Sequence, residues 1–130
     1  MKVSVSKNAR VVLEKRYLKK DESGKAIESP EDMFQRVARS IAEADRLFDP
    51  QANVEKTELK FQKLITNLWF LPNSPTMMNA GRRLGQLAAC FVLPIEDSME
   101  SIFETVKHTA MIHKSGGGTE IGRASCRERV

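Results

Sequence analysis

The sequence predicts a mainly α-helical amino-terminal region followed by the first βα unit of an α/β domain. Two observations support this fold class. Apolar residues recur at steps of three and four through the first two-thirds of the chain, which is the period of an amphipathic helix. Near Ala88 the pattern changes to a short apolar run, a second helical pattern and a glycine-rich turn, which is how an α/β domain begins.

The first helices are recognised by their start signals. We expect a short helix over residues 8–19, followed by a polar turn that contains glycine. Ser29 can then cap a second helix, Pro30 suits its first position, and Asp32 can reach back toward the cap. The apolar stripe of this helix is expected to run to Phe48, with an Asp-Pro pair directly after it as the stop.

A third helix is expected over residues 55–70. Its buried side is expected to consist of Leu59, Leu64, Ile65, Leu68 and Trp69. Residues 71–81, LPNSPTMMNAG, have the prolines, asparagines and glycine of a loop. Because this stretch also carries a leucine and two methionines, we expect a packed loop.

The α/β part is expected to start with a strand. LAACFVL, residues 87–93, is a short apolar run between a glycine and a proline, which is typical of a buried strand. Asp97 to Glu100 have the pattern of a capping box that opens a further helix, ended by the SGGG of residues 115–118. The inner face of that helix is expected to be Ile102, Phe103, Val106, Ala110 and Met111.

The last eleven residues, EIGRASCRERV (120–130), have no apolar period of a helix or strand and are rich in arginine. They resemble the in-frame translation of a sequencing-adapter oligonucleotide, so we expect a non-native tail in which Cys126 is not a natural residue. The natural chain is then expected to continue beyond Thr119. The predicted organisation is a helical domain (1–70), the start of an α/β domain (71–119) and this tail.

Composition places the chain among ordinary globular proteins. Of its 130 residues, 41% are hydrophobic and 29% are charged, so neither a disordered nor a fibrous class is indicated. No apolar run reaches the roughly 18 residues of a membrane span, and the start lacks the apolar core of a signal peptide. We expect a cytoplasmic protein with reduced thiols and no membrane partner. The lysines and arginine between Lys15 and Lys20 suggest a nucleic-acid patch, but acidic neighbours favour a solvated helix face.

Four features can carry chemistry, and each has a structural alternative. Cys90 is either a reactive thiol or a core residue, and a cysteine in an apolar strand is more often the latter. The loop at Gly118 can bring backbone close to a ligand or simply end a helix. Ser74 can contact a phosphate or cap a turn. His108 and His113 are five residues apart and have no ligand at metal-site spacing, so no metal site is predicted.

The order of three stretches is more specific than any single feature. They are FLPNSPTMMNAG, LGQLAACFVLPIEDSMESIFE and KHTAMIHKSGGGT. In this order they resemble the large catalytic chain of ribonucleotide reductase, most of all its adenosylcobalamin-dependent class. The resemblance extends over Val11 to Thr119. It implies a truncated ten-stranded α/β barrel after the helical region, and an enzyme that reduces ribonucleotides to deoxyribonucleotides by radical chemistry.

The resemblance also implies roles for individual residues. Cys90 matches one member of a redox cysteine pair, and with Ala89 it matches substrate contacts beside the ribose. Ser74 matches a contact to the substrate phosphates, and Gly118 matches a close approach of backbone to substrate. Asp97 matches a site for a deoxynucleoside triphosphate effector, and it is also expected to be the helix N-cap.

The partners implied are a ribonucleotide, that effector, a thioredoxin-like dithiol and a second copy of the full-length chain, without direct nucleic-acid binding. The sequence departs from the family at Glu120, where a glycine is expected, and it lacks the remaining cysteines and most of the cobalamin site. We therefore expect this chain to be inactive by itself. Two alternatives remain open: the iron- or manganese-dependent class of the same enzyme, and a small helical nucleic-acid-binding module.

Overall fold

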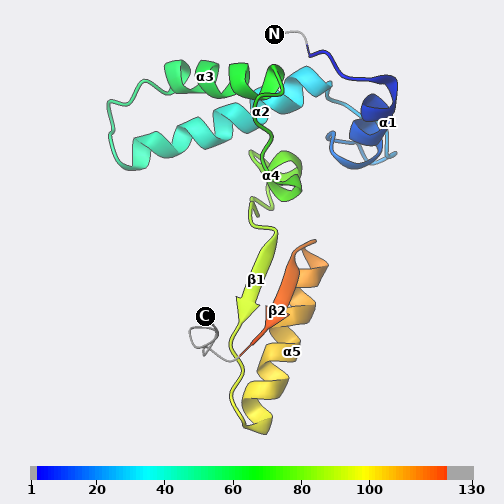
Figure 1. The fold of residues 1–130 in the computed structure, drawn as a ribbon, viewed down its shortest axis with the longest axis vertical. Coiled ribbons are helices and arrows are strands. Elements are labelled where there is room, and N and C mark those ends of the chain that lie inside the picture. The colour runs from blue at the N-terminus through cyan, green and yellow to red at the C-terminus, as the bar shows by residue number, and fades with distance from the viewer. Residues whose placement is uncertain (1–2, 123–130) are drawn as a thin grey trace. The chain divides into compact units, whose positions relative to one another are not determined.

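The computed structural model describes residues 3–122, which form two compact units that divide between Leu87 and Ala88 (Figure 1). Each unit is described here by itself. The division lies beyond the domain boundary expected at residue 70. The helical unit is longer because Met77 and Ala80, which follow that boundary, are part of its buried core.

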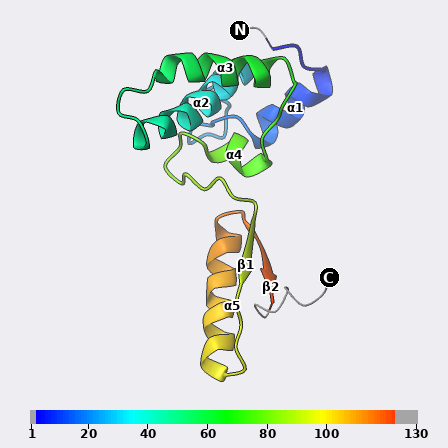
Figure 2. The same ribbon diagram turned by 60° about the vertical axis from the view of Figure 1, so that its left-hand side comes forward.

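The first unit is helical. Its elements are α1 (Lys7–Arg16), α2 (Pro30–Ala42), a 3-10 helix η1 (Glu43–Leu47), α3 (Val54–Thr66) and α4 (Ser74–Asn79). Helices α2 and α3 lie side by side, as both views show (Figures 1 and 2). Residues 71–81, which were expected to form a packed loop, contain the short helix α4. The other helices expected in this unit are present, and each ends earlier than expected.

Helix α2 begins as its start signal predicts. The Ser29 hydroxyl oxygen accepts from the Asp32 N–H at 3.1 Å, and the Asp32 carboxylate accepts from the Ser29 N–H at 2.9 Å. This reciprocal capping box satisfies two backbone donors. The predicted end was wrong, because α2 stops at Ala42 and a 3-10 turn follows. Phe48 consequently leaves the apolar stripe and is 88% exposed.

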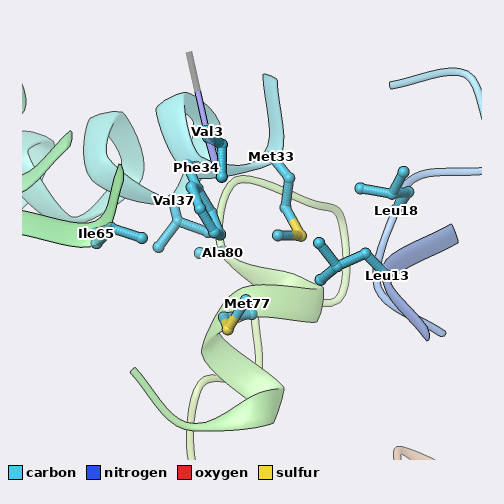
Figure 3. Packing of buried hydrophobic residues seen from close by; sticks show 9 residues of the cluster. All are labelled: Val3, Leu13, Leu18, Met33, Phe34, Val37, Ile65, Met77 and Ala80. Atoms are coloured by element: carbon cyan, nitrogen blue, oxygen red, sulfur yellow. The ribbon is translucent and has the colours of Figure 1, made fainter. Parts of the chain in front are cut away.

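The core of the first unit lies where α1, α2, α3 and α4 meet (Figure 3). Its buried cluster consists of Val3, Leu13, Leu18, Met33, Phe34, Val37, Ile65, Met77 and Ala80. Met33, at the centre of the view, is fully buried. Of the five residues expected on the buried side of the third helix, only Ile65 is buried. The helix ends at Thr66, and Leu68 adopts a left-handed φ of 57°, so Leu68 and Trp69 leave the helical stripe.

A charged network ties the segment before α2 to the end of α4. The Glu28 carboxylate is paired with Arg36 at 2.8 Å and with Arg82 at 3.2 Å, and it accepts from the Lys19 N–H at 2.9 Å. Burial alone raises the pKa of Glu28. The hydrogen bonds and charges of these donors outweigh burial, and the pKa lies below its ordinary value. Arg36 also donates to the carbonyl of Ala80 at the C-terminal end of α4.

The second unit is a strand–helix–strand arrangement of β1 (Cys90–Leu93), α5 (Met99–Lys114) and β2 (Gly118–Ile121). The two strands are parallel, with Cys90 opposite Gly118 and Leu93 opposite Ile121 (Figures 1 and 2). Parallel strands need such a crossover, here supplied by α5. The expected βα unit is present. Strand β2 was not predicted, and it includes the first two residues of the expected tail; residues 123–130 of that tail lie outside the described part.

The expectation for the inner face of α5 was wrong. Thr105 is buried and its hydroxyl donates to the carbonyl of Pro94 at 3.0 Å, whereas Phe103, Val106 and Met111 are exposed. Hydrophobic periodicity marks an apolar stripe but does not say what covers it. Within residues 3–122, no helix is both long enough and apolar enough to cross a membrane.

Candidate functional site

The pairing of β1 with β2 brings three of the predicted site residues together. Cys90 and Gly118 are partners in the parallel register. The Gly118 N–H donates to the carbonyl of Ala89 at 2.8 Å. Ala89, Cys90 and Gly118 thus form one short stretch of paired backbone, although 28 residues separate Cys90 from Gly118 along the chain. We refer to these three residues as the strand site.

The turn that delivers Gly118 to this site is specified locally. After α5 ends, the Gly116 N–H bonds to the carbonyl of His113 at 3.0 Å, and the Gly117 N–H bonds to that of Ile112 at 3.1 Å. This is a Schellman motif, which requires a left-handed residue after the helix. Gly116 supplies it with a φ of 88°. The glycine-rich segment therefore ends a helix, which was one of the two roles considered for it from the sequence. It also begins β2.

Packing within this unit does not require a glycine at position 118. Its backbone is that of a strand and is not left-handed. A Cβ added there would lie 3.5 Å from the carbonyl oxygen of Ala89, which is an ordinary van der Waals contact. A missing side chain in a strand leaves room for close approach to the backbone. Space for an incoming molecule is thus available beside Cys90.

Cys90 is exposed, and its thiol is free. The expectation of a buried strand was wrong, because none of the four residues of β1 is buried in the described part of the chain. Within the described residues β1 has β2 as its one paired neighbour, and α5 packs against the pair, so nothing further covers the Cys90 side chain. An exposed thiol is accessible to small molecules and to other thiols, which a core cysteine is not.

Ser74 belongs to the first unit, whereas the strand site belongs to the second. It is the first residue of α4, and the preceding Asn73 caps that helix by accepting from the Thr76 N–H at 3.0 Å. The Ser74 hydroxyl lies 3.0 Å from the hydroxyl of Tyr17. Tyr17 was missed by sequence reasoning, because 57 residues separate the two and no local pattern links them.

Asp97 lies in the segment between β1 and α5 and is exposed. The predicted capping role was wrong, because the N-cap is Ser98, whose hydroxyl accepts from the Ser101 N–H at 3.1 Å. A hollow of about 480 Å³ lies beside this segment, and its lining includes Glu96, Glu100 and Glu104 but not Asp97. Three carboxylates make that hollow unsuitable for a triphosphate.

The described residues offer no metal site, since residues 3–122 contain no group of three or more His, Cys, Asp or Glu side chains placed to share an ion. His108 lies 3.4 Å from the carboxylate of Glu104, and His113 lies 2.9 Å from the hydroxyl of Thr119. The apolar cavity lined by α2, α3 and the segment after α3 has a volume of about 100 Å³, which is far too small for a corrin ring.

Comparison with known proteins supplies the family context. The family model described as "Ribonucleotide reductase, all-alpha domain" matches residues 3–85, and the model described as "Ribonucleotide reductase, barrel domain" matches residues 88–129. The two matches meet where the structure divides into its two units.

Individual relatives agree with these matches. A vitamin B12-dependent ribonucleoside-diphosphate reductase of Mycobacterium tuberculosis is 47% identical over 117 residues, which is 90% of this chain and 17% of the relative. One from Thermoplasma acidophilum is 40% identical over 166 residues, covering 86% of this chain and 22% of the relative. A ribonucleoside-diphosphate reductase large subunit of Danio rerio is 36% identical over 115 residues, covering 88% and 13%. The chain spans less than a quarter of the length of each of these relatives.

Proposed function

This chain belongs to the family of ribonucleotide reductase large subunits, and from that membership we propose that it is the amino-terminal part of a vitamin B12-dependent ribonucleoside-diphosphate reductase. The observation that carries the proposal is the position of Cys90. An accessible thiol lies at the start of β1, opposite a glycine that packing does not require, in the region matched by the barrel family model. We further infer that β1, α5 and β2 open a ten-stranded barrel.

In the proposed reaction, Cys90 is one of two thiols that reduce the ribose. The 2′ C–O bond breaks and its oxygen leaves as water, while a C–H bond forms in its place. The two electrons and two protons come from two thiols, which become one disulfide. The second cysteine of the pair lies outside this chain, and a thioredoxin-like dithiol regenerates both thiols by exchange.

The remaining site residues have binding roles in this proposal. The backbone at Ala89 and Gly118 borders the ribose, which the accessible space beside Gly118 supports. Ser74 donates a hydrogen bond to a substrate phosphate, and its exposed hydroxyl supports that role. Asp97 contacts a deoxynucleoside triphosphate effector. Because Ser98 and not Asp97 caps α5, the Asp97 carboxylate is available for this contact.

We propose adenosylcobalamin as the cofactor of the complete protein, because relatives named for vitamin B12 dependence match at 40–47% identity. When bound, that group supplies the radical that starts the reaction. The apolar cavity of the first unit is too small for it, and we assign its binding to residues outside this chain. The iron- or manganese-dependent class is the alternative, and relatives whose names carry no B12 dependence match at 34–37%.

The experiment that tests the function uses the complete protein. The source DNA is read across codon 119, and the full reading frame is expressed. We expect formation of deoxyribonucleoside diphosphates that requires both adenosylcobalamin and a dithiol, and no such activity from the 130-residue chain. Reduction without cobalamin, in the presence of a metal-containing second subunit, favours the alternative class. Absence of nucleotide reduction under both conditions contradicts the proposal.

A further inference from the structure

We propose that Tyr17 is a positioning residue that orients the Ser74 hydroxyl toward a nucleotide phosphate. The inference rests on the proposed function, because it deepens the role given there to Ser74. It starts from one contact: the hydroxyl oxygens of Tyr17 and Ser74 lie 3.0 Å apart, within hydrogen-bond distance. The contact joins the C-terminal end of α1 to the first residue of α4.

Tyr17 is held on both its backbone and its ring. Its N–H donates to the carbonyl of Leu13, and its carbonyl accepts from Arg82, each at 2.8 Å. Arg82 in turn is paired with the buried carboxylate of Glu28. The Tyr17 ring is half-buried and packs against the core cluster. These contacts hold the Tyr17 side chain in place, with its phenol oxygen at the surface. Little side-chain entropy of Tyr17 is then lost when a ligand binds.

Ser74 is fixed in its backbone but not in its hydroxyl. Asn73 caps α4 through its side-chain oxygen, and its side-chain N–H donates to the carbonyl of Leu87 at 3.0 Å. These bonds set where the Ser74 Cβ lies. A serine hydroxyl can still rotate among three staggered positions, and an exposed one exchanges partners with water. A neighbouring group must select the rotamer if the hydroxyl is to be ready for a ligand.

The acidity of the two hydroxyls sets the direction of the bond. A phenol is a stronger acid than an alkyl alcohol and hence the better hydrogen-bond donor, so Tyr17 O–H donates and the Ser74 oxygen accepts. The Ser74 proton is then free to be donated to an anionic oxygen. Donation to a charged acceptor is stronger than donation to a neutral one. Accepting from Tyr17 further polarises the Ser74 hydroxyl as a donor.

The test is made in the complete protein, with equilibrium binding of a ribonucleoside diphosphate and of the corresponding ribonucleoside. Tyr17→Phe removes one oxygen and keeps the ring. We expect it to weaken diphosphate binding by about five- to tenfold, the effect of one charge-assisted hydrogen bond. Ribonucleoside binding should be unchanged, and KM should rise while kcat changes less than about twofold.

Two further comparisons separate positioning from a general structural role. Tyr17→Phe should add nothing to the loss caused by Ser74→Ala, and it should retain its effect in Ser74→Thr, which keeps a hydroxyl. Thr57→Val is the matched control, because it removes a hydroxyl that donates to Asp45 over the same 3.0 Å in the same unit. That variant should leave the diphosphate affinity unchanged.

The inference is overturned if Tyr17→Phe leaves diphosphate affinity unchanged, weakens the ribonucleoside equally, or has its full effect in the Ser74→Ala background. Failure of the proposed function is seen separately. Wild-type protein that binds the diphosphate but never reduces it contradicts the proposed reaction, while the affinities of the variants still decide the role of Tyr17.

Discussion

Cys90 lies directly opposite Gly118 in the parallel pair of strands β1 and β2, and the Gly118 N–H bonds to the carbonyl of the residue before the cysteine. The backbone around the thiol is therefore fixed by a strand that arrives 28 residues later in the chain. Strand pairing holds backbone atoms more closely than a loop does, which suits a site where a thiol must meet one bond of a substrate.

Gly118→Ala should separate stability from binding. The added Cβ meets only ordinary contact with the Ala89 carbonyl oxygen, so the free energy of unfolding of this 130-residue chain should change by less than about 1 kcal/mol. If substrate approaches this backbone, the methyl group should raise KM by about tenfold or more. Thermal unfolding and steady-state kinetics measure the two effects. An unchanged KM removes Gly118 from the proposed site.

Cys90→Ser should abolish turnover without unfolding the protein. In this 130-residue chain, where the residue is exposed, the exchange of sulfur for oxygen should cost less than about 0.5 kcal/mol of stability. A serine cannot form the disulfide that carries away two electrons, so deoxynucleotide formation driven by a dithiol should fall to background. Product chromatography checks this. A variant that still turns over many times shows that Cys90 is not a redox thiol.

Asp97→Ala and Ser98→Ala form a matched pair that assigns capping and effector binding to different residues. Ser98 caps α5, so its substitution should cost about 1 kcal/mol of stability, whereas Asp97→Ala should cost almost none. Loss of Asp97 should weaken the response of substrate choice to a deoxynucleoside triphosphate. Unfolding curves and product ratios with and without effector give the answer. The effector role is rejected if the ratios respond as in the wild type.

Glu28→Gln should destabilise the helical unit, since it leaves Arg36 and Arg82 without a carboxylate partner. We expect a loss of about 1–3 kcal/mol, less than for a fully buried pair because both arginines retain some exposure. Chemical unfolding of this chain, followed by far-ultraviolet circular dichroism, measures the loss, because the first unit contains most of the described α-helices.

The same network gives that unit a defined pH dependence. The pKa of Glu28 is lower in the folded state than its ordinary value of 4.5, so its stabilising effect is complete above that value. The effect is lost as the pH falls through the folded-state pKa. The difference in stability between wild type and Glu28→Gln should therefore shrink below about pH 4.5. A difference that stays constant down to pH 3 contradicts this assignment.

Local signals in the sequence predicted helices and turns well. The capping box of Ser29 and Asp32 and the glycine-rich end of α5 both depend on groups within a few residues of one another. Such bonds form whenever the chain takes the local conformation, so residue type and spacing are enough to identify them. The end of α2 was less predictable, because a 3-10 turn satisfies the same backbone groups as a further helical turn.

The sequence by itself determined the succession of α1, α2, α3, β1 and α5, the capping box of α2 and the likeness to ribonucleotide reductases. The tertiary structure alone decided which side chains are covered and which distant groups meet: Cys90 is exposed, the apolar side of α5 is uncovered, Tyr17 reaches Ser74, and Glu28 pairs with Arg82. The physical reason is that periodicity records which side of an element is apolar, whereas burial and pairing depend on which other segment packs there.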